Sequence, residues 1–440
     1  MNRSKFYSLL VSGACALGCA SKSTPATPER ASALPASCAA LNTPPPSHGA
    51  QYAMSMPLGV GQEGEWCRFF VAQDEMWVNG SELALTRGAH HSILWTTEYD
   101  AIPTENRSGE TVDTSGAFPC PAGALGDWQV DAVVAASQSQ NESITPSRLP
   151  TGVAFHVTAG QVLLMNSHML NTSSQPIEPC FVINLETVPA AEVEHEAGFL
   201  QFYNLFVTVP AHGSSIAANA CPVTGDFTLL NLVSHMHSRG VHFVANLESS
   251  DGSLQEQLFS GSEWHDPISA KFGAGYPLKA GQWLDYRCED QNDSAVDVAE
   301  GLKTTDEMCV LDGTYYPRDR RFERCGEEFG SADGVQYNPE GTASGADFVA
   351  CWYRSPLEFN LGAGPSNQAA RYATQSCVTQ LCRKAAKPVR PFIACMNAHG
   401  ATCQASCPAA GPASWACLQT CIQEQYCKPE YDAVAQATCD

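Results

Sequence analysis

Short apolar runs in a strand-like pattern dominate the chain between residues 38 and 317. Examples are residues 152–157, 161–165 and 227–233, and Gly, Pro, Asn and Asp separate such runs from one another. Strong helical periodicity is absent from this part of the chain. Many short strands divided by turn residues are typical of β-sandwiches. We therefore predict an all-β fold for this part of the chain.

The first 37 residues follow a different pattern. A basic start and a short apolar run at 6–17 lead into Ala-Leu-Gly-Cys at 16–19. This order is typical of a bacterial lipoprotein signal peptide, residues 1–19, in which Cys19 becomes the lipidated first residue of the mature protein. An ordinary signal peptide cut nearby is the alternative, and both interpretations predict export. Residues 20–37 are rich in Ser, Thr, Ala and Pro, which predicts a linker.

Composition narrows the class of protein further. The chain has 440 residues, long enough for two ordinary domains with additional segments. It carries 46 acidic against 24 basic residues, a formal net charge of −22. This balance argues against a nucleic-acid partner, because phosphate would be repelled. No later apolar run reaches the roughly 18 residues of a membrane-spanning helix. We therefore predict membrane contact only through the lipid anchor, on a cell-envelope or secreted protein.

Cysteines dominate the C-terminal part. Residues 331–375 are rich in Gly, Ala and Ser and predict a connection, whereas residues 376–440 contain nine of the 20 cysteines. Two pairs of these cysteines are each spaced by four residues: Cys403 with Cys407, and Cys417 with Cys421. On helices, this spacing puts both sulfurs of a pair on one face. Two antiparallel helices joined by two disulfides would satisfy the pattern, and a zinc site is the alternative.

Candidate metal-binding residues occur in four clusters. In chain order they are His90 and His91, then His168, then His235 and His237, and finally Asp306-Glu307-Met308-Cys309. Each cluster alone is a weak signal. On a strand, a His-x-His motif puts both rings on one face, because side chains alternate with period two. Two adjacent histidines point to opposite faces, so they can share one metal only at a turn or a bulge.

In this order, the four clusters resemble the copper ligands of peptidylglycine alpha-hydroxylating monooxygenase and dopamine beta-monooxygenase. Their flanks are similar too, notably Arg-Leu-Pro-Thr-Gly-Val-Ala-Phe at 148–155 and Asp-Tyr-Arg-Cys at 285–288. The resemblance covers about residues 38–325. It implies two antiparallel, jelly-roll-like β-sandwiches side by side, residues 38–192 and 193–330, with a solvent cleft between the metals.

The resemblance also implies two copper sites and an activity. The first copper would be held by His90, His91 and His168, and the second by His235, His237 and Met308. Imidazole suits copper in both oxidation states, and a thioether favours Cu(I). The second site would therefore activate O2, with Met308, His235 and His237 as catalytic residues, while the first site stores an electron from ascorbate or another donor. The implied reaction is hydroxylation of an sp3 C–H bond of a small organic substrate.

Four disulfides are implied by the same resemblance. They are Cys38–Cys180, Cys67–Cys120, Cys221–Cys325 and Cys288–Cys309. This pairing leaves Cys351 and the nine cysteines of the tail. Ten cysteines are an even number, enough for five further bridges in an oxidising compartment.

The sequence departs from the peptide-amidating enzymes at positions that bind the peptide carboxylate. Val233 replaces an Arg, and Val310 and Asp312 replace an Asn and a Tyr. We therefore do not expect peptidylglycine to be the substrate. Asp312 either faces the substrate pocket, where it would pair with a cationic amine, or is a turn residue before Gly313.

Two other functions compete with the monooxygenase. A non-catalytic copper-binding or copper-storage lipoprotein would keep the same ligands, although storage does not need two different ligand sets. Alternatively, the cysteine-rich tail has a structural or adhesion role and the β-domains are its scaffold. Oxygen uptake with a reductant separates the enzyme from a storage protein.

Overall fold

The computed structural model describes residues 34–138, 143–325, 334–354, 368–407 and 412–440. The predicted signal peptide with Cys19 and most of the predicted linker lie outside these residues. The described chain begins just before a short 3-10 helix, Ala36–Leu41, so the last two residues of the predicted linker are helical. No helix within the described ranges has the length and apolarity to cross a membrane.

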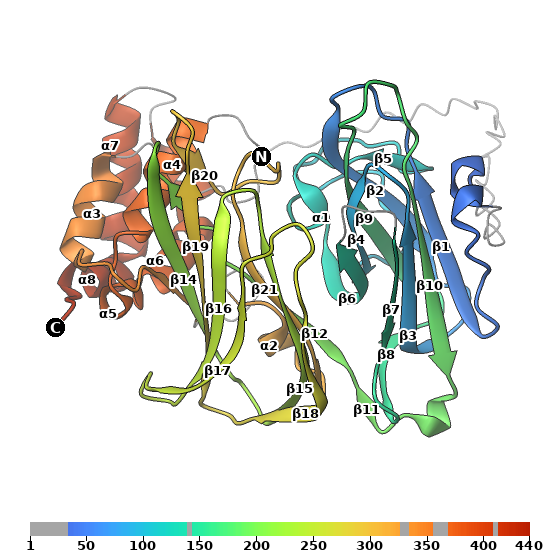
Figure 1. Cartoon of the computed structure of the whole chain (residues 1–440). Coiled ribbons are helices and arrows are strands. Elements are labelled where there is room, and N and C mark those ends of the chain that lie inside the picture. The colour runs from blue at the N-terminus through green and yellow to red at the C-terminus, as the bar shows by residue number, and fades with distance from the viewer. Residues whose placement is uncertain (1–33, 139–142, 326–333, 355–367, 408–411) are drawn as a thin grey trace, which may run out of the picture. The chain divides into compact units, whose positions relative to one another are not determined.

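The first β-sandwich consists of two sheets (Figure 1). One sheet contains β1 (Gly49–Ser55), β10 (Cys180–Val188), β3 (Met76–Leu85), β8 (Val153–Val157) and β11 (His195–Glu196) in this order, with β7 (Ser143–Arg148) also paired to β3. The other contains β5 (Ala117–Pro119), β2 (Glu63–Val71), β9 (Val162–Leu170), β4 (Ala89–Thr97) and β6 (Val130–Gln138). Buried side chains such as Met54, Leu83 and Met165 fill the space between the sheets. Short helices α1 (Gly123–Asp127) and Ala190–Glu192 lie in connections.

The second β-sandwich is built in the same way. Its first sheet has the order β12 (Gly198–Tyr203), β21 (Cys309–Tyr316), β15 (Phe227–Met236) and β18 (Ala270–Leu278). Its second sheet has the order β17 (Leu254–Gly261), β16 (Gly240–Glu248), β19 (Trp283–Asn292), β14 (Gly213–Pro222) and β22 (Val335–Tyr337). A small pair, β13 (Thr208–Val209) with β20 (Val298–Ala299), and the helix α2 (Arg320–Glu323) complete it.

Strand alternation determines which side chains leave the core of the second sandwich. On β15, Leu232 and Met236 belong to the buried cluster between its two sheets. Because successive side chains point to opposite faces, Val233 and His235 lie on the outer face of the same sheet. On β21, Leu311 is in the core, which puts Val310 and Asp312 on that outer face as well.

The two sandwiches contact each other through an ion-pair group around Arg318. Its guanidinium lies 3.2 Å from a carboxylate oxygen of Asp131 in β6 and 3.2 Å from one of Glu196 in β11. The same group lies 2.6 Å from Glu323 in α2. Burial lowers the pKa of Arg318, but these carboxylates outweigh burial and raise it, so the cation is firmly held between the two sandwiches.

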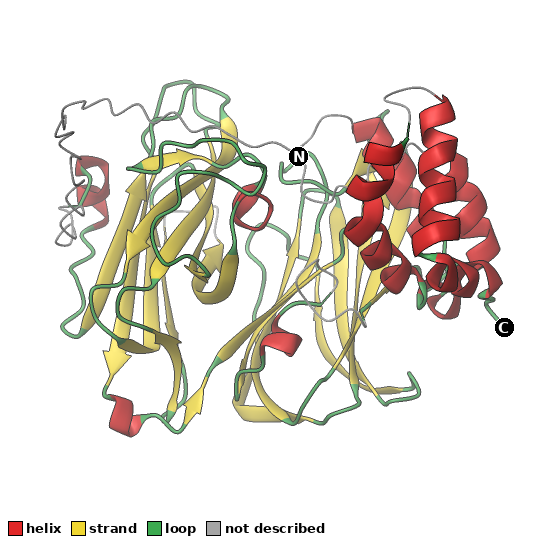
Figure 2. Cartoon of the chain, turned by 180° about the vertical axis from the view of Figure 1, so that it is seen from behind, coloured by secondary structure: helices red, strands yellow, loops and turns green. Residues whose placement is uncertain are grey.

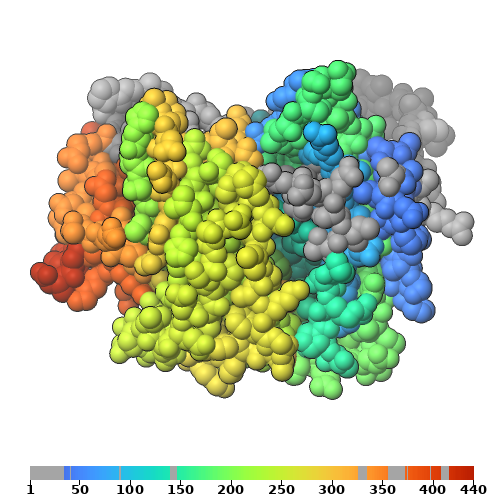
Figure 3. Space-filling view, viewed as in Figure 1, coloured from blue at the N-terminus to red at the C-terminus, as the bar shows by residue number. Residues whose placement is uncertain are grey.

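The C-terminal part is helical, as predicted. Its helices are α3 (Gly345–Arg354), α4 (Gln368–Val378), α5 (Arg383–Ala386), α6 (Val389–Ser406), α7 (Pro412–Thr420), the π-helix Cys421–Tyr426 and α8 (Lys428–Gln436). Figure 2 shows these helices gathered beside the second sandwich, and in Figure 3 the orange and red atoms of the tail lie against the green atoms of β14. Ala218 and Ala220 of β14 share one buried cluster with Trp352 and Phe392 of the helices.

The segment 331–375 is more than the connection that the sequence predicted. It contains β22, which extends a sheet of the second sandwich, and α3, which buries Phe348 and Trp352 against the other helices. The boundary between the sandwiches also shifts from residue 192, because β11 pairs in parallel with β8 of the first sandwich. The second sandwich therefore begins after Glu196.

Disulfides follow the predicted pattern. All four pairings implied by the family resemblance are present. Five further bridges join Cys351–Cys377, Cys382–Cys439, Cys395–Cys427, Cys403–Cys421 and Cys407–Cys417. The last two join the pairs spaced by four residues, as expected for two stapled helices. The zinc alternative for the tail is therefore wrong, because its nine cysteines are all bonded in pairs, one of them to Cys351. So many disulfides indicate an exported protein.

Candidate metal centre

The histidine pair of the first sandwich lies at a β-bulge. In the pairing of β4 with β9, His91 is opposite His168, and the register shifts between Ala89 and His91. His90 is therefore the extra residue on β4. A bulge re-aims side chains, so the backbone has the irregularity that two adjacent histidines need to turn toward one side. The side chain of His90 itself lies outside the described part.

His91 and His168 are close, and two carboxylates accompany them. The ring centroids of His91 and His168 are 5.4 Å apart. Glu63 Oε1 lies 3.1 Å from His168 Nε2, and Glu65 Oε1 lies 3.7 Å from His91 Nε2. Both carboxylates come from β2, where residues two apart share a face, and β2 pairs with β9 so that Glu65 is opposite His168.

The carboxylates change the protonation of this pair. Burial alone would raise the pKa of Glu63, but hydrogen bonds with His168 and Thr304 outweigh it and lower the pKa to about 2. Burial lowers the pKa of His168, yet Glu63 and Glu65 more than offset this, and the net shift is upward. Burial raises the pKa of Glu65. A metal at this pair would therefore compete with a proton for the ring of His168.

His235 and His237 lie at the end of β15, with ring centroids 5.3 Å apart. His235 Nδ1 lies 2.7 Å from Oε1 of Gln138, whose Nε2 donates to the carbonyl oxygen of Trp264 at 2.8 Å. This places the proton of neutral His235 on Nδ1 and the lone pair on Nε2. Burial and then the charge of His168 lower the pKa of His235 to about 4, so its ring is neutral at pH 7.

Met308 lies beside His237. One oxygen of Glu307, Oε1, accepts hydrogen bonds from the backbone N–H groups of His237 at 2.6 Å and Met308 at 2.9 Å. The other oxygen accepts from the N–H of Arg239 at 2.9 Å. Glu307 is fully buried and Met308 is 6% exposed. The carboxylate of Glu307 thus holds the turn after β15 against the start of β21.

The two predicted ligand sets meet in the structure. The rings of His91 and His235 are 5.7 Å apart at right angles, although they belong to different sandwiches. His168, His91, His235 and His237 therefore form a continuous row of rings. The solvent cleft expected between the sites is not seen at these rings, because Gln138 and Glu63 of the first sandwich bond directly to the second.

No three of the described His, Cys, Asp and Glu side chains are arranged as they would be around a metal ion. Each predicted ligand set contributes only two such side chains. The third ligand is a thioether, Met308, in one set and His90 in the other, where the side chain is not described. The donor types fit copper, because imidazoles and one thioether are nitrogen and soft sulfur ligands.

Asp312 lies in the middle of β21, opposite Gln201 of β12 and Val233 of β15. The interpretation as a turn residue is therefore wrong. Its partly buried side chain shares the outer sheet face with His235, two residues farther along the strands.

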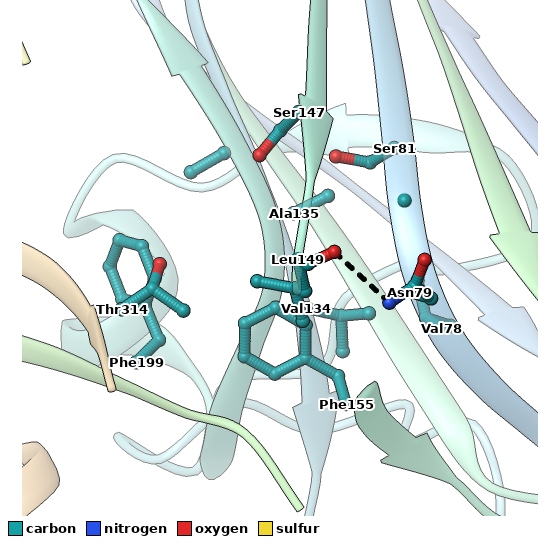
Figure 4. Close-up of a pocket in the computed structure, with 12 residues that line it drawn as sticks. Val78, Asn79, Ser81, Val134, Ala135, Ser147, Leu149, Phe155, Phe199 and Thr314 are labelled. Atoms are coloured by element: carbon teal, nitrogen blue, oxygen red, sulfur yellow. Dashed lines mark hydrogen bonds between the residues drawn. The ribbon is translucent and has the colours of Figure 1, made fainter. Parts of the chain in front are cut away.

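A small cavity lies elsewhere on the contact between the sandwiches. Its volume is ≈ 50 Å³, and its lining includes Asn79, Phe155, Phe199 and Thr314 (Figure 4). Asn79 donates to the carbonyl oxygen of Leu149 across its edge, at 3.3 Å. Such a volume holds about three or four water molecules. None of its lining residues belongs to the row of histidines, so we do not include it in the candidate site.

Glu63, Glu65, Gln138 and Glu307 were not singled out from the sequence. The motif Glu63-Gly64-Glu65 carries the same period-two signal as His-x-His, and Glu307 stands next to Met308. The first signal is visible in the sequence, but carboxylates usually face solvent, and Glu307 was noted only as a neighbour of Met308. Gln138 has no sequence signal, because its partner His235 lies 97 residues away.

No family model matches the chain, and no curated protein matches it. Among solved structures, the exported protein XepA of PBSX is 9% identical, with a TM-score of 0.17 over 62% of this chain and 90% of that chain. A triple jelly-roll protein from the turret assembly of an archaeal virus is 8% identical, with a TM-score of 0.18 over 61% of this chain and 59% of the other. A protein of infectious bursal disease virus, Gt strain, is 10% identical, with a TM-score of 0.14 over 62% and 74%. At such scores the likeness carries no argument about function, and the two-sandwich architecture rests on the strands described above.

Proposed function

We propose that this chain is a copper-dependent monooxygenase that hydroxylates an sp3 C–H bond of a small organic substrate, using O2 and an external reductant. One observation carries the proposal. The four clusters that resemble the copper ligands of the ascorbate-dependent monooxygenases are far apart in sequence. In the fold, His168, His91, His235 and His237 nevertheless lie in one row, with Met308 beside it.

The proposed ligands divide into two sets. His91 and His168, with His90, would hold one copper, and His235, His237 and Met308 would hold the other. Bound copper would supply one-electron redox chemistry and O2 activation, which no side chain of the protein can provide. The thioether of Met308 favours the reduced ion, and the neutral ring of His235 presents a lone pair without first losing a proton.

Other residues place these ligands. Glu307 fixes the backbone of His237 and Met308 relative to each other. Gln138 orients the ring of His235. The contact between the rings of His91 and His235 gives electrons a short path from one set to the other.

We propose that Asp312 contacts the substrate. Its side chain shares the outer sheet face with His235 and would pair with a cationic amine. Val233 and Val310, its neighbours on that face, supply no anchor for a carboxylate. Peptidylglycine therefore does not fit this face. Replacing Asp312 by Asn should raise KM for a cationic substrate more than it lowers kcat.

We also propose the cellular compartment and the reductant of the enzyme. The disulfides place the protein in an oxidising compartment. Lipidation at Cys19 would anchor it in a bacterial envelope, and ascorbate or another small donor would reduce it there. Intact mass measurement of the mature protein detects or excludes a lipid on Cys19.

The test of function uses the full mature chain loaded with copper. We expect two copper ions per chain and O2 consumption with ascorbate, with one atom from 18O2 appearing in a product from a pool of small molecules. Two bound copper ions without O2 consumption would favour the storage protein. One copper per chain, or zinc in both sites after copper-sufficient folding, contradicts the proposal.

A further inference from the structure

Glu63 contacts both sandwiches at the candidate site. Its Oε1 atom lies 3.1 Å from Nε2 of His168 within the first sandwich. The same oxygen accepts hydrogen bonds from the backbone N–H of Thr304 at 3.0 Å and from its hydroxyl at 2.9 Å. Thr304 lies in the loop between β20 and β21, four residues before Met308. One carboxylate oxygen thus joins a residue of the first ligand set to the loop that carries Met308.

The loop transmits this contact to the rest of the second set. The carbonyl oxygen of Thr304 accepts from the hydroxyl of Ser238 at 2.7 Å, and that of Thr305 accepts from Arg239 Nη1 at 2.7 Å. Ser238 and Arg239 immediately follow His237. Glu307, in the same loop, binds the backbone of His237 and Met308. A displacement of Thr304 would therefore move the backbone on both sides of the second ligand set.

We propose that Glu63 is a positioning residue that couples the two ligand sets and holds the sandwiches in the arrangement in which the rings of His91 and His235 touch. The contact itself does not depend on copper. Its consequence for turnover rests on the proposed function, because electron transfer between the sets would require the rings to stay close. The hydrogen bonds that Glu63 accepts are stronger than those of a neutral acceptor, because its carboxylate is ionised.

Removal of Glu63 should leave the fold intact, because other contacts between the sandwiches do not involve it. Arg318 still bridges Asp131 and Glu323, and Gln138 still bonds to His235. The side chain of Glu63 is also partly exposed, at 18%, so its truncation leaves no sealed cavity.

The test begins with metal-free full-length protein. Acylation of each histidine by diethyl pyrocarbonate is followed by mass spectrometry in the parent and in Glu63→Ala, Glu63→Gln and Thr304→Ala. In Glu63→Ala, we expect His91 and His235 to react about tenfold faster, the factor that corresponds to one hydrogen bond to a charged group. Glu63→Gln keeps an oxygen for the N–H of Thr304 and should recover part of the protection. Thr304→Ala loses only the hydroxyl bond and should have a smaller effect.

The chain offers a matched control. Glu75 Oε1 lies 2.9 Å from Nε2 of His156 in the first sandwich, and no described hydrogen bond or ion pair links this pair to the second sandwich. Glu75→Ala should leave the reactivity of His91 and His235 unchanged. The double variant Glu63→Ala with Thr304→Ala should react no faster than Glu63→Ala alone, because both changes break the same contact. Unchanged reactivity in Glu63→Ala, or an equal rise in Glu75→Ala, overturns the proposal.

A second measurement separates this inference from the proposed function. With two Cu(II) ions bound, magnetic broadening of the electron paramagnetic resonance spectrum should be strong in the parent and weak in Glu63→Ala at equal copper content. Equal broadening in both proteins contradicts the coupling by Glu63. A parent protein that binds no copper contradicts the proposed function, while the acylation experiment still decides the role of Glu63.

Discussion

The thioether of Met308 is the one soft donor of the proposed ligand sets, and it is buried beside His237. In Met308→Ile, the bulk is similar but the sulfur is gone. Copper should still bind at His235 and His237, more weakly, and the sulfur contribution to its X-ray absorption should disappear. Turnover should fall by about a hundredfold or more, the factor that misplacement of a reacting group can cost.

A matched variant is Met165→Ile. Met165 is likewise a buried methionine, but it packs in the core of the first sandwich. Met165→Ile should leave both the sulfur signal and turnover nearly unchanged. Full activity and an intact sulfur signal in Met308→Ile would mean that Met308 is not a ligand.

Glu307 contacts the backbone around the second ligand set. Its two oxygens accept from three backbone N–H groups, and an amide retains only one acceptor oxygen. Glu307→Gln should therefore lower the free energy of unfolding by about 1–3 kcal/mol, the cost of an unsatisfied buried donor. The Cu–S signal of Met308 should weaken as well.

Asp127→Asn is the control for this change, since the buried side chain of Asp127 accepts a hydrogen bond from the backbone N–H of Ala122, far from the ligands in sequence. It should lower stability in urea denaturation but leave the Cu–S signal as it is. A Glu307→Gln protein with the parent's stability and spectrum would show that the carboxylate positions neither His237 nor Met308.

The sequence predicted the histidines and Met308 but not the residues that place them. A motif is visible when its members are neighbours, as in His-x-His, or when the order of several motifs resembles a family. Glu63 bonds to Thr304, 241 residues away, and such a pair leaves no local signal. The same holds for Gln138 and His235. These pairs are brought together by the contact between the two sandwiches. Strand alternation predicts which side chains face a core, but it does not predict how two sandwiches contact each other.

Among the elements, the disulfide-stapled helices of the tail were predictable and β22 was not. Four-residue cysteine spacing has a direct geometric meaning on a helix, and the bridges Cys403–Cys421 and Cys407–Cys417 follow from it. β22 has three residues, too few to show alternation, and it stands in a Gly- and Ala-rich segment. Its place on the sheet edge is fixed by pairing with β14 and by the helices packed on it.

The junction between the tail and the second sandwich should give stability a pH dependence. Asp285 of β19 is buried there, 2.6 Å from the hydroxyl of Tyr337 and 3.7 Å from Arg383 of α5. Burial, and then the nearby Glu248, raise the pKa of Asp285 to about 7. The folded state therefore holds this proton more tightly than the unfolded state does. Its contribution to stability is complete below pH 4 and is lost as the pH rises toward 7.

Asp285→Asn should remove this component of the pH dependence, which we expect to be about 2–4 kcal/mol between pH 4 and pH 7. Urea unfolding at several pH values measures it. The exposed Asp293→Asn is the control and should leave the profile unchanged. An identical profile in Asp285→Asn and the parent would contradict the assignment.

The disulfides of the molecule differ in the exposure of their cysteines. The cysteines of the four sandwich bridges are at most 2% exposed, whereas Cys439 at the C-terminal end is exposed. Thiol exchange requires access to sulfur. Under mild thiol reductant, we expect Cys382–Cys439 to open first and the four sandwich bridges to remain closed. Differential alkylation with mass spectrometry identifies the opened pair, and early opening of Cys288–Cys309 would contradict this order.

The disulfides would also limit which electron donor could serve the proposed enzyme. Cys309 directly follows Met308, so the peptide that carries the soft donor is tied to β19 through an oxidised sulfur pair. The proposed copper ions would need to be reduced in every catalytic cycle, whereas the disulfides of the fold must stay oxidised. A two-electron thiol donor would serve the first need, but it would attack exposed bridges such as Cys382–Cys439 by exchange. A one-electron, non-thiol donor of the ascorbate type avoids this conflict. The proposed enzyme would therefore suit a compartment in which metal reduction and thiol chemistry are kept apart.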